Sequence, residues 1–474
     1  MSHFKRTLNF KSTIAIVIGG IIGSGIFMKP ALMVSQLGSP LVLLSVWIVA
    51  GIITLFGALS NAEVAAMIPE TGGQYVFFKK MYGDGFAFLY GWAAFAVFNC
   101  AGNASIAYVC SQYTNYFFVL PKFSVATEHL FHIHIPMIGN FFPLENFGIK
   151  MLTIVIVVLL TFINYRSVGY GAWLQRILTA LKIVAIVLLI GGIFFSGKGN
   201  LHHLTETLPA TPKGFAMIAA YIAAIAGAFW AYDGWNNITF IAGEVQHPQK
   251  NIPQSLFLGL TFCIIVYALI NLAFIYVLPV GAMAASGFVA SDAATAAWGT
   301  IGGGLIALLV ILSTFGTTNA NILATARVTY AMGEENRLFA WAGKPQPHYN
   351  TPGNALWLNA GWSIILVMSG SFDMLTDMLI FVSWFFYGSS ALGVFILRKK
   401  MTEAERPYKV IGYPVVPMLF VLFTAFFLVV TLYADIKNYF EGTAEIINSV
   451  FGIVITCVGI PIYFLSKKKR ESYK

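Results

Sequence analysis

Apolar runs of about 20 residues recur along almost the whole chain, and the short segments between them hold most of its Lys and Arg. A run of that length crosses the hydrocarbon core of a bilayer as a single helix. Only 10% of the 474 residues are charged, compared with about 25% in soluble globular proteins. The pattern therefore predicts an all-α polytopic membrane protein and argues against a soluble fold.

We predict twelve transmembrane helices that together form one membrane domain over residues 1–474. The predicted spans are 12–35, 40–66, 86–118, 147–165, 171–195, 214–242, 254–279, 297–331, 354–371, 374–397, 414–434 and 447–466. The net charge of +9 is divided among the segments between these spans and forms no single basic face, so a nucleic-acid partner is not expected.

The distribution of Lys and Arg fixes the expected orientation in the membrane. A cytoplasmic N-terminus puts 21 of them in inner segments and six in outer segments, in agreement with the positive-inside rule. The remaining one, Lys182, lies inside a span. We expect a multi-pass protein of the cell (plasma or inner) membrane, in contact with lipid and with both termini cytoplasmic. The six outer residues are Lys29, Lys122, Lys150, Lys198, Lys213 and Lys437.

Two spans contain a break at their middle. Span 12–35 contains the run GGIIGSG, and span 214–242 contains FWAYDGWN. Glycine weakens a helix by about 1 kcal/mol relative to alanine, and unpaired backbone at membrane depth is tolerated where it lines a cavity or is buried in protein. Small residues also serve close helix packing. Because there are two breaks and one of them contains Asp233, we favour a binding site near the bilayer midplane.

The two breaks lie five spans apart, which is the spacing that paired inverted repeats of five spans produce. We therefore predict a first repeat over residues 12–195 and a second repeat over 214–397. The two remaining spans, within 414–466, follow the repeats.

Four sequence segments together resemble one known group of proteins. They are GGIIGSGIF in the first span, SNAEVAAMIPETGGQYVF after the second, FWAYDGWNNITFIAGEVQHPQKNIP in the sixth and ATARVTYAMGEENRLF after the eighth. They resemble the amino acid–polyamine–organocation (APC) superfamily, and within it the L-amino-acid transporter (LAT) type of permease and exchanger. The resemblance implies a LeuT-like 5+5 inverted repeat with broken helices 1 and 6, and alternating access around the breaks.

The resemblance also implies which residues bind an amino acid. Its carboxylate would meet the backbone N–H groups of Ser24 and Gly25 and the Ser24 hydroxyl, since a helix N-terminus attracts anions. Its ammonium would meet the carbonyls of Ile21, Trp230, Ala231 and Asp233, which lie at helix C-terminal ends. Trp230 occupies the position of the aromatic gate on the outer side; the alternative is that it packs against neighbouring helices.

Lys182 stands alone in an apolar span, about 11 residues from its start. A lysine at the bilayer centre costs roughly 2.5–3.5 kcal/mol, so a functional partner is expected. The alternative, snorkelling to the interface, requires a position nearer a helix end. The sequence resembles relatives in which such a lysine replaces a sodium ion, which implies contacts with the backbone near Gly23 and with Ser313 or Thr317.

Asp233 has two interpretations. Its carboxylate caps the half-helix that begins near Trp235, a role for which Asp is favoured. Alternatively the carboxylate faces the cavity, where it attracts cationic amino acids or titrates a proton.

Other polar residues at family positions are also candidates. Glu63 and Glu244 are expected near the cytoplasmic face, with Arg327 as a candidate partner. Further residues that we expect to line the pocket are Asn103, Ser383 and Tyr387.

The predicted function is sodium-independent transport of L-amino acids, as an exchanger (antiporter) of neutral, small substrates. The alternative is a proton-coupled uptake symporter on the same fold. The sequence has no P-loop motif GxxxxGK[ST] and no catalytic constellation in its spans, so we expect neither an enzyme nor a cofactor. Three histidines at 129, 132 and 134 have no accompanying cysteine, and no metal site is expected. Residues 119–146 contain no cysteine, so no covalent heavy-chain partner is expected.

Overall fold

The computed structural model describes residues 6, 8–70, 72–166, 182–335, 340–349 and 351–471. Nearly all secondary structure in these residues is helical. The α-helices of the first half are α1 (Phe10–Ile21), α2 (Gly25–Leu37), α3 (Pro40–Met67), α4 (Gln74–Met81), α5 (Asp84–Ala93), α6 (Cys100–Thr114), α7 (Val125–Leu130), α8 (Phe147–Arg166), the helical residues Lys182–Phe194, and α10 (Phe215–Tyr232). Those of the second half are α11 (Asn237–Phe240), α12 (Pro248–Val277), α13 (Val280–Ala284), α14 (Val289–Trp298), α15 (Thr300–Glu334), α16 (Gly353–Ser369), α17 (Phe372–Lys400), α18 (Val415–Phe440) and α19 (Asn448–Glu471).

Shorter elements complete the fold. A π-helical segment, η1 (Ala94–Asn99), joins α5 to α6, and three 3₁₀ turns occur at η2 (Leu201–Leu204), η3 (Ala242–Glu244) and η4 (Ala340–Gly343). Strands β1 (Ile133–Ile135) and β2 (Gly139–Phe141) form an antiparallel hairpin in which His134 is opposite Asn140.

The predicted spans agree well with the helices. Within the described residues, nine helices are long and apolar enough to cross a membrane, and α1 with α2 forms a tenth candidate as a bent pair. The predicted span 354–371 corresponds to α16, which has 17 residues. The predicted span 171–195 is described only from Lys182, since residues 167–181 lie outside the described part of the chain. The structure thus supports a multi-pass helical membrane protein.

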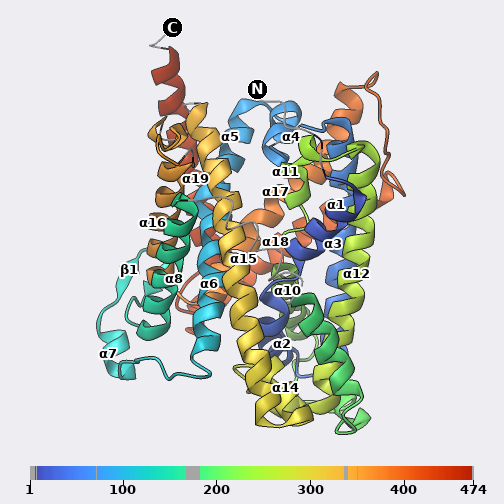
Figure 1. Ribbon diagram of the computed structural model, residues 1–474, viewed down its shortest axis with the longest axis vertical. Helices are drawn as coiled ribbons and strands as arrows, with labels where there is room; N and C mark the ends of the chain where they lie inside the picture. Colours follow the sequence, from blue (N-terminus) through green and yellow to red (C-terminus); the bar gives the residue numbers. More distant parts are fainter. Residues whose placement is uncertain are drawn as a thin grey trace. The chain divides into compact units, whose positions relative to one another are not determined.

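Both predicted breaks are present. The first span bends by 42° between Ile21 and Gly25, where the helix is interrupted for three residues (Figure 1). The sixth span stops at Tyr232 and resumes as the short helix α11 at Asn237. Each break ends one helix and begins another in the middle of an apolar stretch, so backbone groups that a continuous helix would pair lose their usual partners.

The chain divides into two compact units. Unit 1 consists of Met1–Tyr90, Leu204–Leu272 and Ser383–Thr431, and unit 2 of Gly91–His203, Ala273–Val382 and Leu432–Lys474. Both helix breaks belong to unit 1. The long helices α6, α8 and α15 belong to unit 2, and they pack there against α16 around small and apolar residues.

Unit 1 contains a buried ion cluster at the end of α3. The Glu63 side chain is 1% exposed and accepts two hydrogen bonds from the Arg398 guanidinium, at 2.9 and 2.7 Å. It also accepts the backbone N–H of Val410 at 2.8 Å, and Arg406 Nε lies 3.7 Å away. The ring of Tyr413 lies 3.5 Å below the Arg398 guanidinium. These contacts fix α3, α17 and the segment between α17 and α18 to one another.

One expectation about charged residues was wrong. Arg398, and not Arg327, pairs with Glu63, because the segment after α17 returns to the end of α3. Lys29, which was counted among the outer lysines, is buried inside α2, with its Cδ near Gly227 of α10.

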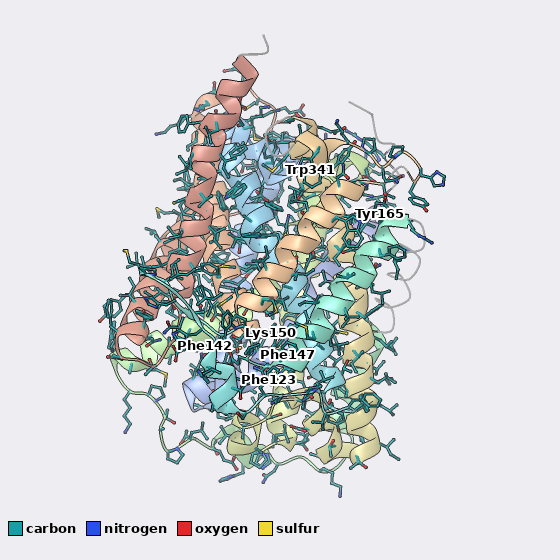
Figure 2. All side chains as sticks on the ribbon, turned by 90° about the vertical axis from the view of Figure 1, so that its left-hand side faces the viewer. Phe123, Phe142, Phe147, Lys150, Tyr165 and Trp341 are labelled. Carbon is teal, nitrogen blue, oxygen red and sulfur yellow. The ribbon has the colours of Figure 1, made fainter. Side chains whose placement is uncertain are left out.

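The hairpin of unit 2 is attached to α8 by Lys150. This lysine is buried, and its ammonium group donates to the carbonyls of Phe142 at 2.8 Å and Pro143 at 3.5 Å. Figure 2 shows Lys150 next to Phe142 and Phe147. His134 Nδ1 lies 2.8 Å from Asn140 Oδ1, so the side chain of this histidine has a partner within the hairpin.

Replacement of Glu63 by Gln is expected to lower the free energy of unfolding by about 3–5 kcal/mol, because it leaves the mostly buried charges of Arg398 and Arg406 without a counter-charge. The measurement is unfolding of the purified protein in detergent. The matched control is Glu70→Gln, which breaks an exposed pair with Lys80 and should cost about 0–1 kcal/mol. Equal effects of the two substitutions would contradict a special role for the buried cluster.

Candidate functional site

The two breaks lie against each other in unit 1. A Cβ atom on Gly25 would lie 2.6 Å from the Cα of Ala231, so the start of α2 touches the backbone of α10 (Figure 1). A Cβ atom on Gly234 would lie 2.5 Å from the carbonyl oxygen of Gly20, and Gly234 has a φ of +96°, which favours glycine. Glycine at these positions lets the C-terminal ends of α1 and α10 meet the N-terminal ends of α2 and α11.

The N-terminal end of α2 supplies hydrogen-bond donors. Ser24 is the N-cap residue of α2, its side chain makes no capping bond, and the residue is only 3% exposed. Within the described part of the chain its hydroxyl has no hydrogen-bond partner. The first N–H groups of a helix have no partner within that helix and carry a partial positive charge. This set of donors, from Ser24 and Gly25, suits a carboxylate.

The carbonyl oxygens at the ends of α1 and α10 are joined by a residue that the sequence analysis missed. The hydroxyl of Tyr267, on α12, lies 3.0 Å from the carbonyl oxygen of Ile21 and 2.9 Å from that of Ala231, and the two carbonyls share its single proton. A carbonyl oxygen has two lone pairs, so each can accept a second donor such as a substrate ammonium. Tyr267 thus holds in place two of the carbonyls that were predicted to bind the ammonium.

Aromatic packing fixes the position of the Tyr267 ring. Its centroid lies 4.9 Å from that of Tyr232 and 5.5 Å from that of Trp47. The Tyr232 hydroxyl donates to the carbonyl of Trp47 at 3.0 Å, which ties α10 to α3. All three residues are fully buried. No local sequence motif marks Tyr267, which is one of two tyrosines in the sequence of α12.

Asp233 is held by α17. It is the C-cap residue of α10, and its Oδ1 accepts a hydrogen bond from the Tyr387 hydroxyl at 2.7 Å. The Tyr387 ring in turn lies 5.1 Å from that of Trp235. The capping interpretation of Asp233 was wrong, because the N-cap residue of α11 is Asn236. The side chain of Asn236 itself makes no capping bond.

Asn236 instead belongs to a buried polar chain between helices. Its Oδ1 accepts a hydrogen bond from Asn61 Nδ2 at 2.5 Å, and the Ser390 hydroxyl donates to Asn61 Oδ1 at 2.8 Å. Because the partners come from α3 and α17, the span-6 break is fixed to both helices.

Other predicted residues have structural surroundings of their own. Trp230 is buried in the last turn of α10, and its role as a gate stays a prediction. Asn103, in unit 2, donates to Thr325 at 3.2 Å and accepts from Asn321 at 2.8 Å, so it links α6 to α15. Ser383 is buried in α17.

The lysine predicted to replace sodium lies in unit 2. Lys182 is 4% exposed, at the first described residue of its helix. Ser313, in α15, is also buried, and its hydroxyl has no hydrogen-bond partner among the described residues. The Thr317 hydroxyl donates to the Ser313 carbonyl at 2.9 Å, a bond within the helix. Gly23 is in unit 1, and its predicted contact with Lys182 stays a prediction.

Comparison with known families then identifies the chain. A family model described as amino acid permease matches residues 8–460. The chain belongs to the amino acid permease family. This finding confirms the resemblance to the APC superfamily, and the relatives of the permease support the LAT type within it.

Three relatives illustrate the range of similarity. The permease is 30% identical to the serine/threonine exchanger SteT of Bacillus subtilis, over 99% of this chain and 98% of that protein. It is 31% identical to the large neutral amino acids transporter small subunit 2 of Mus musculus, over 97% of this chain and 81% of that protein. It is 27% identical to the cystine/glutamate transporter of Homo sapiens, over 98% of this chain and 85% of that protein. All three are named as transporters or exchangers and none as an enzyme.

Replacement of Tyr267 by Phe is expected to lower the free energy of unfolding by about 1–3 kcal/mol, because the carbonyls of Ile21 and Ala231 lose their shared donor. Thermal unfolding of the purified permease is the measurement. The control is Tyr221→Phe, which removes a half-buried hydroxyl that contacts Ser45 at 3.1 Å and should change stability by about 0.5 kcal/mol or less. A Tyr267 variant as stable as this control would show that the two carbonyls do not depend on the hydroxyl.

Proposed function

We propose that this permease exchanges neutral, small L-amino acids across the membrane by alternating access, without sodium. The observation that carries the proposal is the meeting of the two helix breaks in unit 1. It places the donors of Ser24 and Gly25 close to the carbonyls of Ile21 and Ala231. An amino acid zwitterion has one anionic and one cationic group on the same carbon, and it needs donors and acceptors arranged in this way.

The choice of small neutral substrates draws on the relatives. SteT, which the chain matches over nearly the full length of both proteins, is named as a serine/threonine exchanger. The cystine/glutamate transporter, at 27% identity, is named for larger and charged substrates. We favour serine-like substrates for two reasons. The backbones of the two breaks are in direct contact at Gly25 and Ala231. The large rings of Tyr232 and Tyr267 pack beside this contact.

Alternating access on two inverted repeats belongs to the same proposal. The first two predicted spans of each repeat fall in unit 1, and the third and fourth of each fall in unit 2. The chain passes from unit 1 to unit 2 at the start of the third span in the first repeat and near the end of the second span in the second repeat, which supports an internal repeat. The fifth spans differ, since 171–195 belongs to unit 2 and most of 374–397 belongs to unit 1. Movement of one unit as a body would change access to the breaks, which both lie in unit 1.

The alternative, proton-coupled symport, has one observation in its favour. Asp233 places a carboxylate in the span-6 break, beside the proposed ammonium site, and the Tyr387 hydroxyl donates to it. A carboxylate in that position could gain or lose a proton during transport.

The test of the main proposal is uptake of radiolabelled L-serine into proteoliposomes at equal pH on both sides. We expect uptake into vesicles preloaded with amino acids and none into vesicles that contain buffer alone, because an exchanger needs a substrate on the far side to return. No heavy-chain partner is added, since residues 119–146 contain no cysteine. Uptake into empty vesicles, driven by an acidic exterior, would instead favour symport.

Sodium independence is tested at Lys182. Replacement of Na⁺ by choline is expected to leave serine exchange unchanged, whereas Lys182→Met should abolish it, because the buried cation would be missing. The control is Lys198→Met, which removes an exposed lysine just beyond the end of the same helix. A large loss of exchange in choline would contradict the proposal, whatever the effect of the substitutions.

The role of Asp233 is tested with Asp233→Asn. The amide oxygen still accepts the Tyr387 hydroxyl, so serine exchange is expected to remain and to be independent of pH. Uptake of arginine and of serine are compared in the wild type and the variant. Serine uptake that depends on pH in the wild type and no longer does so in the variant would show that the carboxylate titrates during transport.

A further inference from the structure

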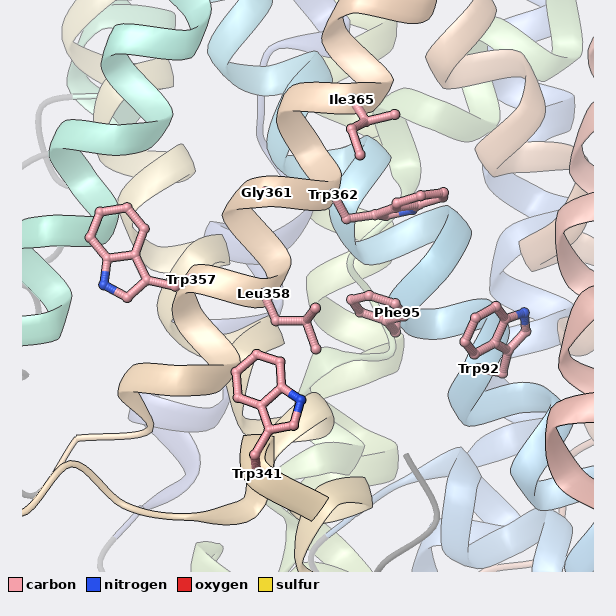
Figure 3. Close-up of a pocket in the computed structure, with 8 residues that line it drawn as sticks. All are labelled: Trp92, Phe95, Trp341, Trp357, Leu358, Gly361, Trp362 and Ile365. Carbon is pink, nitrogen blue, oxygen red and sulfur yellow. The ribbon is translucent and has the colours of Figure 1, made fainter. Parts of the chain in front are cut away.

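Unit 2 contains a cavity of about 460 Å³ that takes no part in the proposed transport site. Its volume is within the range of about 300–1,000 Å³ that is usual for small-molecule sites. The lining is almost entirely apolar and includes four of the ten tryptophans of the chain (Figure 3). The lining residues are Trp92, Phe95, Trp341, Trp357, Leu358, Gly361, Trp362 and Ile365.

One wall of the cavity is an outward-facing stripe on α16. Trp357, Gly361 and Ile365 are spaced by four residues, so they lie on one face of the helix. Trp357 is 40% exposed and Ile365 is 56% exposed. A Cβ atom on Gly361 would meet no other atom within 4 Å, so the glycine leaves an open recess between two bulky side chains.

The opposite wall is formed by Phe95 of η1 and Trp92 of α5. Figure 3 shows Phe95 between Trp362 on one side and Trp92 on the other. The indole N–H of Trp362 donates to the carbonyl of Ala96 at 2.7 Å, and that of Trp92 donates to the carbonyl of Ile455 at 2.8 Å. Both polar groups are therefore satisfied within unit 2, and the wall presents ring carbon to the cavity.

The surroundings of the cavity determine what can occupy it. α16 packs against α6, α8 and α15, all of which belong to helices long and apolar enough to span a membrane. An exposed apolar recess on such helices faces hydrocarbon. The fitting occupant is a flexible hydrocarbon chain, which can fill a recess lined by rings and lacking polar groups.

The end of the cavity near η4 adds a charge preference. Trp341 is in η4, and Lys344 follows it within three residues and is exposed. Arg166, at the end of α8, is also exposed and adjoins Tyr165, whose ring lies 6.4 Å from that of Trp357. The Arg166 guanidinium lies over the ring of Phe162, 4.8 Å from its centroid. The exposed residues Glu334 and Glu335, at the end of α15, also adjoin η4. Lys344 and Arg166 are the cations that an anionic headgroup attached to the acyl chain would meet at this end of the groove.

We propose that this groove binds one acyl chain of an anionic phospholipid, with the headgroup beside Lys344 and Arg166. The chain lies along the Trp357–Gly361–Ile365 stripe, against Phe95. The groove is thus a lipid site of unit 2, separate from the helix breaks of unit 1.

The test uses the full-length permease in phosphatidylcholine vesicles that contain a small amount of phosphatidylglycerol with a diazirine in its acyl chain. After irradiation, the cross-linked peptides are mapped by mass spectrometry. Adducts are expected to concentrate on η4 and α16. The same diazirine in the acyl chain of phosphatidylcholine should give a lower yield, because that headgroup has no net charge.

Gly361→Leu fills the recess and is expected to reduce the affinity, and so the yield of adducts on α16, about tenfold, since the side chain displaces roughly two methylenes of the lipid. The matched control is Gly191→Leu, because a Cβ atom on Gly191 also meets nothing within 4 Å but lies on another helix. Lys344→Gln should reduce the preference for phosphatidylglycerol without abolishing cross-linking.

Three results would overturn the proposal. Adducts spread evenly over exposed faces such as those of α18 and α19 would indicate ordinary boundary lipid only. An unchanged yield on α16 in Gly361→Leu, with the protein folded as judged by its thermal unfolding, would exclude the recess as the binding site. Equal yields with phosphatidylcholine and phosphatidylglycerol would exclude recognition of an anionic headgroup.

Discussion

Backbone groups that lose their helical partners inside an apolar protein have to be paired in another way, and this requirement shapes unit 1. Both interrupted spans leave carbonyls and N–H groups without their helical partners. Two of the carbonyls share the hydroxyl of Tyr267, and the remaining capacity is available to a substrate. The proposed binding site is therefore the part of unit 1 whose hydrogen bonds are left incomplete. The buried, unpaired hydroxyl of Ser24 belongs to the same incomplete set.

The residues around the breaks act mainly by fixing backbone. Asn236 is bonded to Asn61 of α3, and Asp233 to Tyr387 of α17, so the second break is fixed from two sides. At the end of α3, Glu63 fixes the same two helices again through Arg398. Near this cluster the Tyr82 hydroxyl donates to the carbonyl of Ser389 at 2.6 Å, and burial raises the pKa of Tyr82 to about 12, so the donor keeps its proton at neutral pH. Rigid attachment of this kind would let unit 1 move as a body without loss of the geometry of the proposed site.

Much of the fold was predictable from the sequence because each span is a local property. A run of about 20 apolar residues forms a helix in a membrane whatever its neighbours are. Predicted span 40–66 corresponds to Pro40–Met67, and span 147–165 to Phe147–Arg166. The breaks were also predictable, since glycine at positions 19–25 weakens the helix locally. The pairing of charges was not: Arg327 was a reasonable partner for Glu63 by sequence position, yet Arg398 takes that place.

The sequence by itself determined the membrane environment, the positions of the helices, the two breaks and the family, because these follow from hydropathy, from glycine and from motifs a few residues long. The tertiary structure decided which side chains complete the breaks. Tyr267 and Tyr387 lie far along the chain from the groups they bind. Tyr387 was expected near the pocket, but no local pattern indicates its bond to Asp233 or the bonds of Tyr267 to Ile21 and Ala231. The aromatic groove on α16 likewise depends on helix packing, since its walls come from segments more than 200 residues apart and the recess exists only because nothing packs over Gly361.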